Sequence, residues 1–298
     1  ADMDAHDVPL SEALADFYAE QEYKGNRPAT LLYYRKSFTR FLADTGITHL
    51  SQLTPSVVRG WLLEHRGLSP NTLATYDRAL RVFTGWLHRR GYLAASPMAE
   101  LPKPRGRRVE VDTFTADEVR AMLEVARSRY QPLRDTALLI LLLDTGLRIG
   151  EATGLHLRDV SWAEGWLAVD GKSGERTVPF GRKAKAALKR YVDRGRFAAS
   201  PAVTEVFVSA RGTALSVNAA SHRVIKLAKL AGVRSSKRGP HTFRHTFAVE
   251  FIRAGGDAFN LQRMLGHTTL EMTRRYVHLA AGDTRAAHAR FAPADRFL

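Results

Sequence analysis

A run from Ser96 to Glu110 divides this chain, because it contains several residues that interrupt helices and strands. The interrupting residues are Pro97, Pro102, Pro104 and Gly106, and the basic residues among them are Lys103, Arg105, Arg107 and Arg108. No continuous regular element can pass through such a run. With 298 residues, 45% of them hydrophobic, the chain is long enough for two modest cores. We therefore predict two domains, residues 1–95 and 113–298, joined by a basic linker of residues 96–112.

The first domain has the punctuation of four helices. Proline at a first helical turn and glycine just past a last one mark helix ends. The predicted helices run from Leu10 to Glu22, from Pro28 to about Asp44, from Pro55 to about His65, and from Pro70 to just before Gly91. An all-helical domain follows.

The second domain combines helices with one β-hairpin. Helices are predicted over Thr115–Ser128, Pro132–Asp144, Ser216–Leu230 and Asp257–Leu265, and two β-rich runs, Trp166–Asp170 and Arg176–Phe180, flank Lys172 at a glycine-bounded tip. Thr268 and Glu271 have the spacing of a capping box that opens a last helix with Tyr276. The predicted fold class is mainly α with a small antiparallel β-sheet in the C-terminal domain.

The positive charge is unevenly distributed. The first 23 residues contain seven acids and no Lys or Arg and so carry a formal charge of −7, which means that the rest of the chain carries +22 and the total is +15. Such a surplus favours a polyanionic partner, although a solvated surface or anionic lipid would also fit. From Arg223 to Arg244 there are seven basic residues and no acid. This makes the predicted helix Ser216–Leu230 a candidate to bind in a DNA groove. The candidate DNA contacts are Lys103, Arg105, Arg107, Arg108, Arg223, Lys226, Arg78 and Arg81.

Several classes of protein are disfavoured. Without cysteine the chain has no disulfide, cysteine-bound zinc or thiol nucleophile. The most apolar run, Ala137–Leu143, is far shorter than the roughly 20 residues of a membrane helix. No charged-then-apolar signal sequence opens the chain, so we expect a cytoplasmic protein without a membrane partner.

Six residues supply the groups needed to break a phosphodiester without metal or cofactor: Arg148, Lys172, His241, Arg244, His267 and Tyr276. This reaction requires a nucleophile, neutralisation of the nonbridging oxygens and a proton for the leaving oxygen. Arginine suits the second task because its planar fork binds two oxygens and stays charged. Glu151, three residues after Arg148, is expected to hold that guanidinium in place, or to form an ordinary helix ion pair.

A metal site is a less suitable interpretation of the histidines. His241 and His245 have the spacing of two zinc ligands, with His267 as a possible third. The general-base Glu of the familiar metalloprotease motif is missing, and Arg244 between the histidines would repel a cation. We predict no metal, a role for His241 in proton transfer or phosphate binding, and helix packing for His245.

The order and neighbours of the six residues resemble the tyrosine recombinases, the phage integrase family, in the manner of a Xer-like or mobile-element integrase. The segments are TGLRIGE (145–151), GKSGERTVP (171–179), HTFRHTF (241–247), LGH (265–267) and RRYVHL (274–279), with Phe243 where the family more often has leucine. The resemblance implies an N-terminal core-binding domain and a C-terminal catalytic domain. It also implies that Arg148 and Arg244 clamp the scissile phosphate and that Lys172 protonates the leaving 5′ oxygen. His241 would assist proton transfer, His267 would donate to the phosphate, and Tyr276 would form a 3′-phosphotyrosyl link.

The resemblance further implies a homo-tetramer on two double-stranded DNA sites, with a monomer or dimer on one site and strand exchange through a Holliday junction. Accessory DNA-bending or directionality proteins are possible partners. The stretch Asp283–Phe291 would tether a neighbouring protomer, or form an intramolecular lid. Two alternatives stay open at this point: a DNA-binding regulator or architectural protein that does not cut, and a topoisomerase-like enzyme that nicks and seals.

Overall fold

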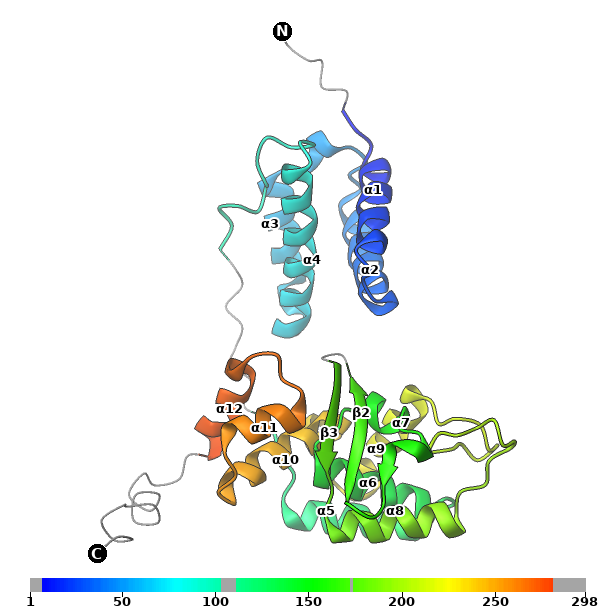
Figure 1. Cartoon of the computed structure of the whole chain (residues 1–298). Coiled ribbons are helices and arrows are strands. Elements are labelled where there is room, and N and C mark those ends of the chain that lie inside the picture. The colour runs from blue at the N-terminus through cyan, green and yellow to red at the C-terminus, as the bar shows by residue number, and fades with distance from the viewer. Residues whose placement is uncertain (1–6, 103–110, 172–173, 281–298) are drawn as a thin grey trace, which may run out of the picture. The chain divides into compact units, whose positions relative to one another are not determined.

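The chain forms two compact units, residues 1–109 and 110–298, and the division falls inside the predicted linker. The computed structural model describes residues 7–102, 111–171 and 174–280. The linker residues Lys103, Arg105, Arg107 and Arg108 and the tail Asp283–Phe291 lie outside the described residues, as does Lys172. Figure 1 labels the helices of both units.

The first unit is built from four helices, as the sequence predicts. They are α1 (Leu10–Tyr23), α2 (Pro28–Thr45), α3 (Pro55–Glu64) and α4 (Pro70–Arg89). Thr54 and Ser69 cap α3 and α4, because their side chains accept hydrogen bonds from the main chain three residues on. At the end of α2, Gly46 has a φ of 66°, a left-handed conformation that glycine adopts without strain.

An aromatic cluster forms the core of this unit. Phe17 of α1 is fully buried, and its ring meets Phe38, Phe83 and Trp86 edge-on at centroid distances of 5.8, 5.3 and 5.4 Å. Edge-on contacts of this kind stabilise by about 0.5–1.5 kcal/mol each beyond the apolar area they bury. The cluster therefore joins α1, α2 and α4 into one body.

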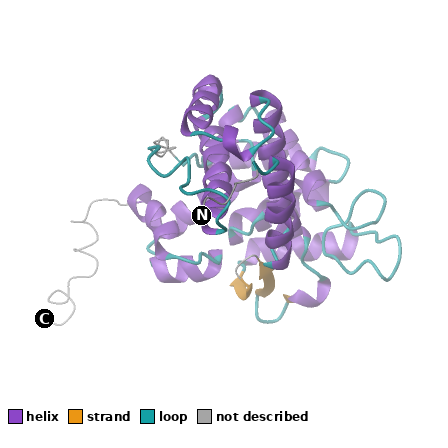
Figure 2. Ribbon diagram, turned by 90° about the horizontal axis from the view of Figure 1, so that it is seen from above, coloured by secondary structure: helices purple, strands orange, loops and turns teal. Residues whose placement is uncertain are grey.

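The second unit combines helices with one small antiparallel sheet, so the predicted fold class is confirmed. Figure 2 colours its strands orange and its helices purple. The helices are α5 (Ala116–Arg127), α6 (Pro132–Thr145), α7 (Ile149–Thr153), α8 (Arg182–Arg194), α9 (Val217–Leu230), α10 (Pro240–Arg253), α11 (Ala258–Leu265) and α12 (Leu270–Ala280). The strands β1 (Val160–Ser161), β2 (Trp166–Gly171) and β3 (Gly174–Pro179) pair in the order β1-β2-β3. The sequence predicts the β2–β3 hairpin but neither α8 nor β1. It also predicts that Arg148 and Glu151 share a helix, and the structure begins that helix, α7, one residue after Arg148.

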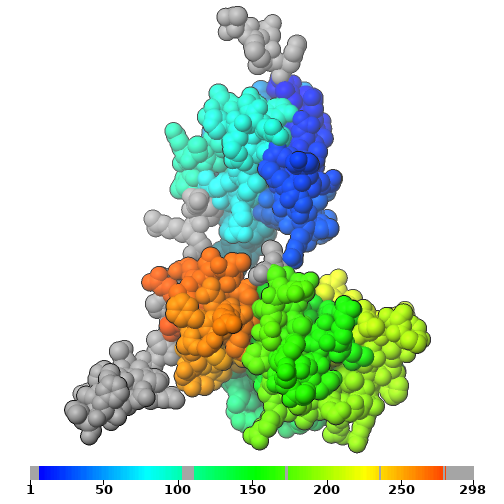
Figure 3. Space-filling model, viewed as in Figure 1, coloured from blue at the N-terminus to red at the C-terminus, as the bar shows by residue number. Residues whose placement is uncertain are grey.

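Two apolar clusters hold the second unit together. The larger centres on α6, with Leu138, Leu141 and Leu142 buried, and includes the inward face of the sheet. The smaller lies among α10, α11 and α12 and contains Phe247 and Tyr276. In Figure 3 the surface of α11 and α12 adjoins that of the hairpin, and α11 contacts β3. Helix α11 therefore lies beside the β2–β3 hairpin, although the two are far apart in the sequence.

The start of α12 corrects one prediction. The helix begins at Leu270, so the residue before it is Thr269 and not Thr268. The Thr268 hydroxyl donates instead to Met272 Sδ, and Glu271 pairs with Arg274 on the next turn. The predicted capping box is therefore wrong, because spacing alone does not fix which threonine lies at the helix boundary.

Among the described residues, no helix combines the length and apolar character needed to cross a membrane.

Candidate active site

Arg148 and Glu151 form the first part of the site, at the start of α7. Arg148 is the residue before the helix, and its main-chain N–H donates to Glu151 Oε2 at 2.8 Å. Its Nη1 donates to Glu151 Oε1, also at 2.8 Å. Both bonds are donated by Arg148 and accepted by Glu151. They differ from the predicted contact along one helix face, because Arg148 lies just outside the helix. The side chain of Arg148 is 27% exposed, so neighbouring atoms cover it only in part.

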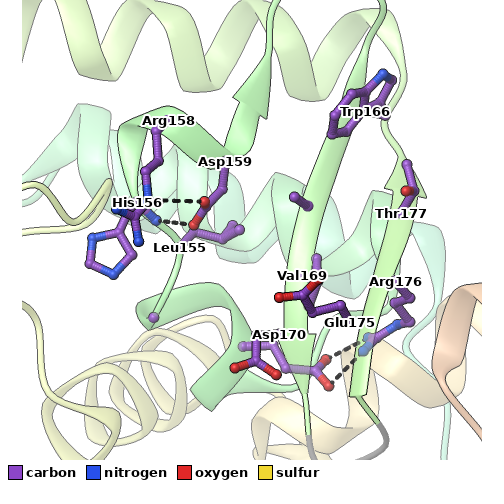
Figure 4. Close-up of a pocket in the computed structure, with 13 residues that line it drawn as sticks. Leu155, His156, Arg158, Asp159, Trp166, Val169, Asp170, Glu175, Arg176 and Thr177 are labelled. Atoms are coloured by element: carbon purple, nitrogen blue, oxygen red, sulfur yellow. Dashed lines mark hydrogen bonds and ion pairs between the residues drawn. The ribbon is translucent and has the colours of Figure 1, made fainter.

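Arg176, on β3, is a second partner of Glu151 that sequence reasoning did not identify. Its Nη1 and Nη2 donate to the two carboxylate oxygens at 3.0 and 2.8 Å. The dashed lines at Arg176 in Figure 4 mark this pair, at one side of a cavity of about 670 Å³. Burial alone would raise the pKa of Glu151, but the hydrogen bonds from Arg176 and Arg148 lower it below its usual value. Glu151 is therefore a buried carboxylate held ionised by two arginines.

Arg244 is buried in the middle of the unit, with only 4% of the residue exposed. Its Nη1 donates to the Gly146 carbonyl at 2.9 Å and its Nη2 to the Leu265 carbonyl at 2.5 Å. Burial, with the charge of Arg148, lowers the pKa of Arg244 to about 10. The guanidinium therefore stays charged at neutral pH while neutral carbonyls hold it in place.

His241 and His245 lie on the first two turns of α10. His241 is exposed by its surface area, although enough protein surrounds the ring to disfavour its charged form. This burial and the positive charges of Arg244 and Arg148 lower its pKa. The ring centroid of His245 lies 6.5 Å from that of His241, so both imidazoles belong to one site.

His245 contacts the hydroxyl of Tyr276, which corrects its predicted role in helix packing. Its Nδ1 is 2.8 Å from Tyr276 Oη. Burial, followed by the charges of Arg275 and His241, lowers the pKa of His245 to about 4. The imidazole is therefore neutral at physiological pH, and its Nδ1 can accept a hydrogen bond.

His267 lies in the turn between α11 and α12. It is 6% exposed, and its Nδ1 is 2.8 Å from Thr273 Oγ1. Its ring stacks on Tyr276 at a centroid distance of 6.1 Å and an interplanar angle of 12°. Burial and the charge of Arg244 lower the pKa of His267 to about 4, so this imidazole is also neutral.

Tyr276 on α12 is fully buried, and two neighbours hold its hydroxyl. Arg275 Nη2 lies 2.8 Å from Oη, and His245 Nδ1 lies at the same distance. An arginine can only donate, so the hydroxyl satisfies both neighbours when it accepts from Arg275 and donates to His245. Arg275 also places its Cζ 4.8 Å from the centroid of the Tyr276 ring.

Five of the six predicted residues are thus brought together from α7, α10, the α11–α12 turn and α12. Arg148 and Arg244 both affect the pKa of His241 and of His267. Among the described residues, no group of three or more His, Asp or Glu side chains has the geometry to hold a metal ion. The pair His241 and Arg244 lies on the first turns of α10.

The predicted DNA contacts that lie in the described residues fall into two groups. Arg78 on α4 and Lys226 on α9 are exposed. Arg81 has intramolecular partners, since it pairs with Asp77 and donates to two main-chain carbonyls. Arg223 pairs with the fully buried Asp135. The contact of each of these residues with DNA stays a prediction.

The chain is similar to proteins of known class along most of its length. The model of the phage integrase family matches residues 112–282. A tyrosine recombinase XerC of Mycobacterium bovis (strain BCG / Pasteur 1173P2) is 35% identical over 269 residues, which cover 87% of this chain and 89% of the relative. A tyrosine recombinase XerC of Thermodesulfovibrio yellowstonii is 33% identical over 265 residues, covering 86% and 87%.

Solved structures share the fold. The Tn1549 transposon integrase in complex with circular intermediate DNA superimposes with a TM-score of 0.78 at 21% identity, covering 96% of this chain and all of that one. A lambda integrase dimer bound to a core site gives a TM-score of 0.74 at 19% identity, covering 89% and 97%. With the family model, the XerC relatives and the site geometry in agreement, the chain belongs to the phage integrase family and is a tyrosine-type site-specific recombinase.

Proposed function

We propose that this recombinase cleaves DNA by attack of Tyr276 Oη on the scissile phosphorus. A tyrosine–phosphorus bond forms, the bond from phosphorus to the 5′ oxygen breaks, and the DNA is left as a 3′-phosphotyrosyl ester. Because the ester keeps the energy of the broken bond, the reverse attack by a 5′ hydroxyl reseals the strand without ATP. The observation that carries the proposal is that the ring of His267 stacks on Tyr276 while Arg244 and Arg148 lie close enough to lower the pKa of His267.

The two arginines are proposed to bind the nonbridging oxygens. Arg244 keeps its full charge because its partners are carbonyl groups, and the side chain of Arg148 is partly exposed. In the tautomer in which the Thr273 hydroxyl donates to His267 Nδ1, the Nε2–H of His267 is left to donate to the phosphate. These groups would neutralise charge that builds up in the transition state.

Proton transfer is proposed to involve Lys172 and His241. Lys172 protonates the leaving 5′ oxygen, and His241 assists transfer at the phosphate, as the family resemblance implies. His245 Nδ1, 2.8 Å from Oη, accepts the hydrogen bond of the Tyr276 hydroxyl in the resting enzyme. With a pKa of about 4, His245 is too weak a base to remove the tyrosine proton at neutral pH, so this proton stays on Oη until the contact breaks.

The burial of Tyr276 implies a conformational step before cleavage. A hydroxyl on a residue with no exposed surface cannot contact a DNA phosphate. We propose that α12 shifts when DNA binds, so that Oη leaves His245 and reaches phosphorus. Steps of this kind often limit the rate of an enzyme.

The partners are proposed to be double-stranded DNA sites and further copies of the chain. Solved relatives with this fold include a lambda integrase dimer bound to a core site, and XerH bound to a palindromic substrate after cleavage. Exposed Arg78 and Lys226, with the basic linker, are the proposed phosphate contacts. Four protomers on two sites would exchange strands through a Holliday junction. The reaction would take place in the cytoplasm, where accessory proteins that bend DNA would assist it.

The cleavage assignment is tested with a nicked substrate that traps the covalent product. Binding sites are first selected from random duplex DNA with the Tyr276→Phe protein, which can bind without reacting. The unaltered chain should then form a protease-sensitive adduct on the nicked site in denaturing gels, and Tyr276→Phe should form none. An adduct that persists in Tyr276→Phe would refute the assignment of the nucleophile.

A further inference from the structure

Each of the three guanidinium nitrogens of Arg176 donates a hydrogen bond within the protein. Its side chain is 10% exposed. Besides the two bonds to Glu151, its Nε donates to the Met264 carbonyl at 2.8 Å, near the end of α11. One guanidinium therefore connects strand β3, the start of α7 and the end of α11, which are separate in sequence.

Two glycines let the main chain approach this guanidinium closely. A Cβ atom on Gly171 would lie 2.8 Å from Arg176 Nη1 and 2.7 Å from Glu151 Oε1. A Cβ atom on Gly266 would lie 3.1 Å from the same Nη1, and Gly266 has a φ of 61°. A side chain at either position would crowd Arg176, so the two glycines allow the main chain to lie close to the guanidinium on both sides.

The bonds of Arg176 extend to both arginines proposed to bind phosphate. Glu151 holds Arg148 Nη1. On the other side, the carbonyl that follows Met264 is that of Leu265, which accepts from Arg244. The same short stretch of main chain leads into His267. A shift of Arg176 would therefore displace several of the proposed phosphate-binding groups together.

Arg176 also alters the charge at Arg148. An ion pair of Arg148 and Glu151 alone would have no net charge. With Arg176 added, the three side chains carry a net charge of +1. In a buried setting that remaining charge attracts a phosphate more strongly than it would in water. The second arginine thus offsets the carboxylate that holds the first one in place.

We infer that Arg176 is a positioning residue for strand cleavage: through Glu151 it orients Arg148, and through Met264 it fixes β3 against the turn that carries His267. The inference rests on the cleavage chemistry proposed above. Arg176 has no contact with DNA in this role and acts through its neighbours.

The first test compares Arg176→Gln and Arg176→Lys with Arg182→Gln, which removes an exposed charge at the start of α8. On the selected nicked site at saturating protein, Arg176→Gln should form the adduct about 10- to 100-fold more slowly. Its dissociation constant for DNA should change less than about threefold. Arg176→Lys should recover little, because an ammonium cannot span both Glu151 oxygens and a carbonyl. An Arg176→Gln rate equal to that of Arg182→Gln would overturn the inference.

A neutral methylphosphonate at the scissile position separates positioning of the clamp from general loss of structure. One negative charge is missing from this linkage, so cleavage depends less on Arg148. The penalty of Arg176→Gln should therefore shrink on the methylphosphonate. An equal penalty on both substrates would mean that Arg176 only stabilises the fold.

A readout without cleavage keeps the inference distinct from the proposed chemistry. Nitrogen NMR of arginine side chains reports how fast the Arg148 guanidinium exchanges protons with water. Exchange should accelerate in Arg176→Gln and stay unchanged in Arg182→Gln. If Arg148 stays equally protected, the inference is wrong even where cleavage occurs. Absence of any Tyr276-dependent adduct in the unaltered chain, with Arg148 loosened as expected, would refute the proposed chemistry alone.

Discussion

Replacement of His245 by leucine should release the nucleophile and accelerate cleavage. The Tyr276 hydroxyl is fully buried and donates to His245 Nδ1 at 2.8 Å. Since this contact has to break before Oη reaches phosphorus, it stabilises the resting state and not the attacking one. Leucine has a similar size and no acceptor, so the variant should keep the packing of α10 and lose only the bond.

The size of the effect follows from the value of one buried hydrogen bond. A neutral bond contributes about 1 kcal/mol net, and a buried donor left without a partner costs about 1–3 kcal/mol. If the shift of α12 limits the rate, destabilising the resting state by about 1 kcal/mol should raise the rate constant of adduct formation about fivefold. Rapid-quench measurement on the nicked site, with protein in excess, gives this rate constant directly.

Asparagine at position 245 is the matched control, because its amide oxygen lies near the place of the imidazole Nδ1. His245→Asn should cleave at nearly the unaltered rate, and both variants should bind DNA equally well. If His245→Leu cleaves more slowly while His245→Asn does not, His245 assists the reaction as the acceptor of the tyrosine proton, and the resting-state argument is refuted.

Two further predictions concern pH and backbone strain. The pKa of His267 is about 4 in the folded chain against 6.5 for the free side chain, so only the unfolded state binds the proton between these values. Its contribution to the free energy of unfolding is therefore constant above pH 6.5 and falls by up to about 3 kcal/mol toward pH 4. Hydrogen exchange of α11 and α12 amides should show a smaller acid loss in His267→Asn, and an equal loss would contradict the burial argument. Gly146→Ala places Cβ 2.4 Å from Phe247 Cδ1 at a φ of 63°, and should cost about 2–4 kcal/mol. Gly46→Ala, at a φ of 66° with open space around it, should cost only about 1 kcal/mol. Equal shifts in thermal midpoint would count against the steric reasoning.

The helices of the first unit are predictable because local signals mark their ends. Pro28, Pro55 and Pro70 each lie at a first helical turn in the structure. In the second unit α8 carries a signal that the sequence reasoning missed, since Ala184, Leu188 and Tyr191 are buried at helical spacing. By contrast, α7 has five residues, too few to show a period.

The catalytic residues are predictable from their types and order, whereas their supporting contacts are not. Arg176 lies 25 positions from Glu151, and no spacing rule connects a strand residue with a helix start at that distance. His245 is 31 positions from Tyr276. Sequence suggests packing for this histidine because its place on α10 is clear, while its partner depends on how α12 folds back over the helix.

The partners of Arg244 show how the fold keeps a buried cation available to a phosphate. A carboxylate would hold the guanidinium equally well but would cancel its charge, whereas the carbonyls of Gly146 and Leu265 accept hydrogen bonds and cancel none. Such contacts require the main chain to come very near the side chain. At Gly146 a Cβ would overlap Phe247 and Leu265. The glycine that ends α6 therefore does more than stop a helix: it brings a neutral acceptor to Arg244, so that the positive charge is left for the scissile phosphate.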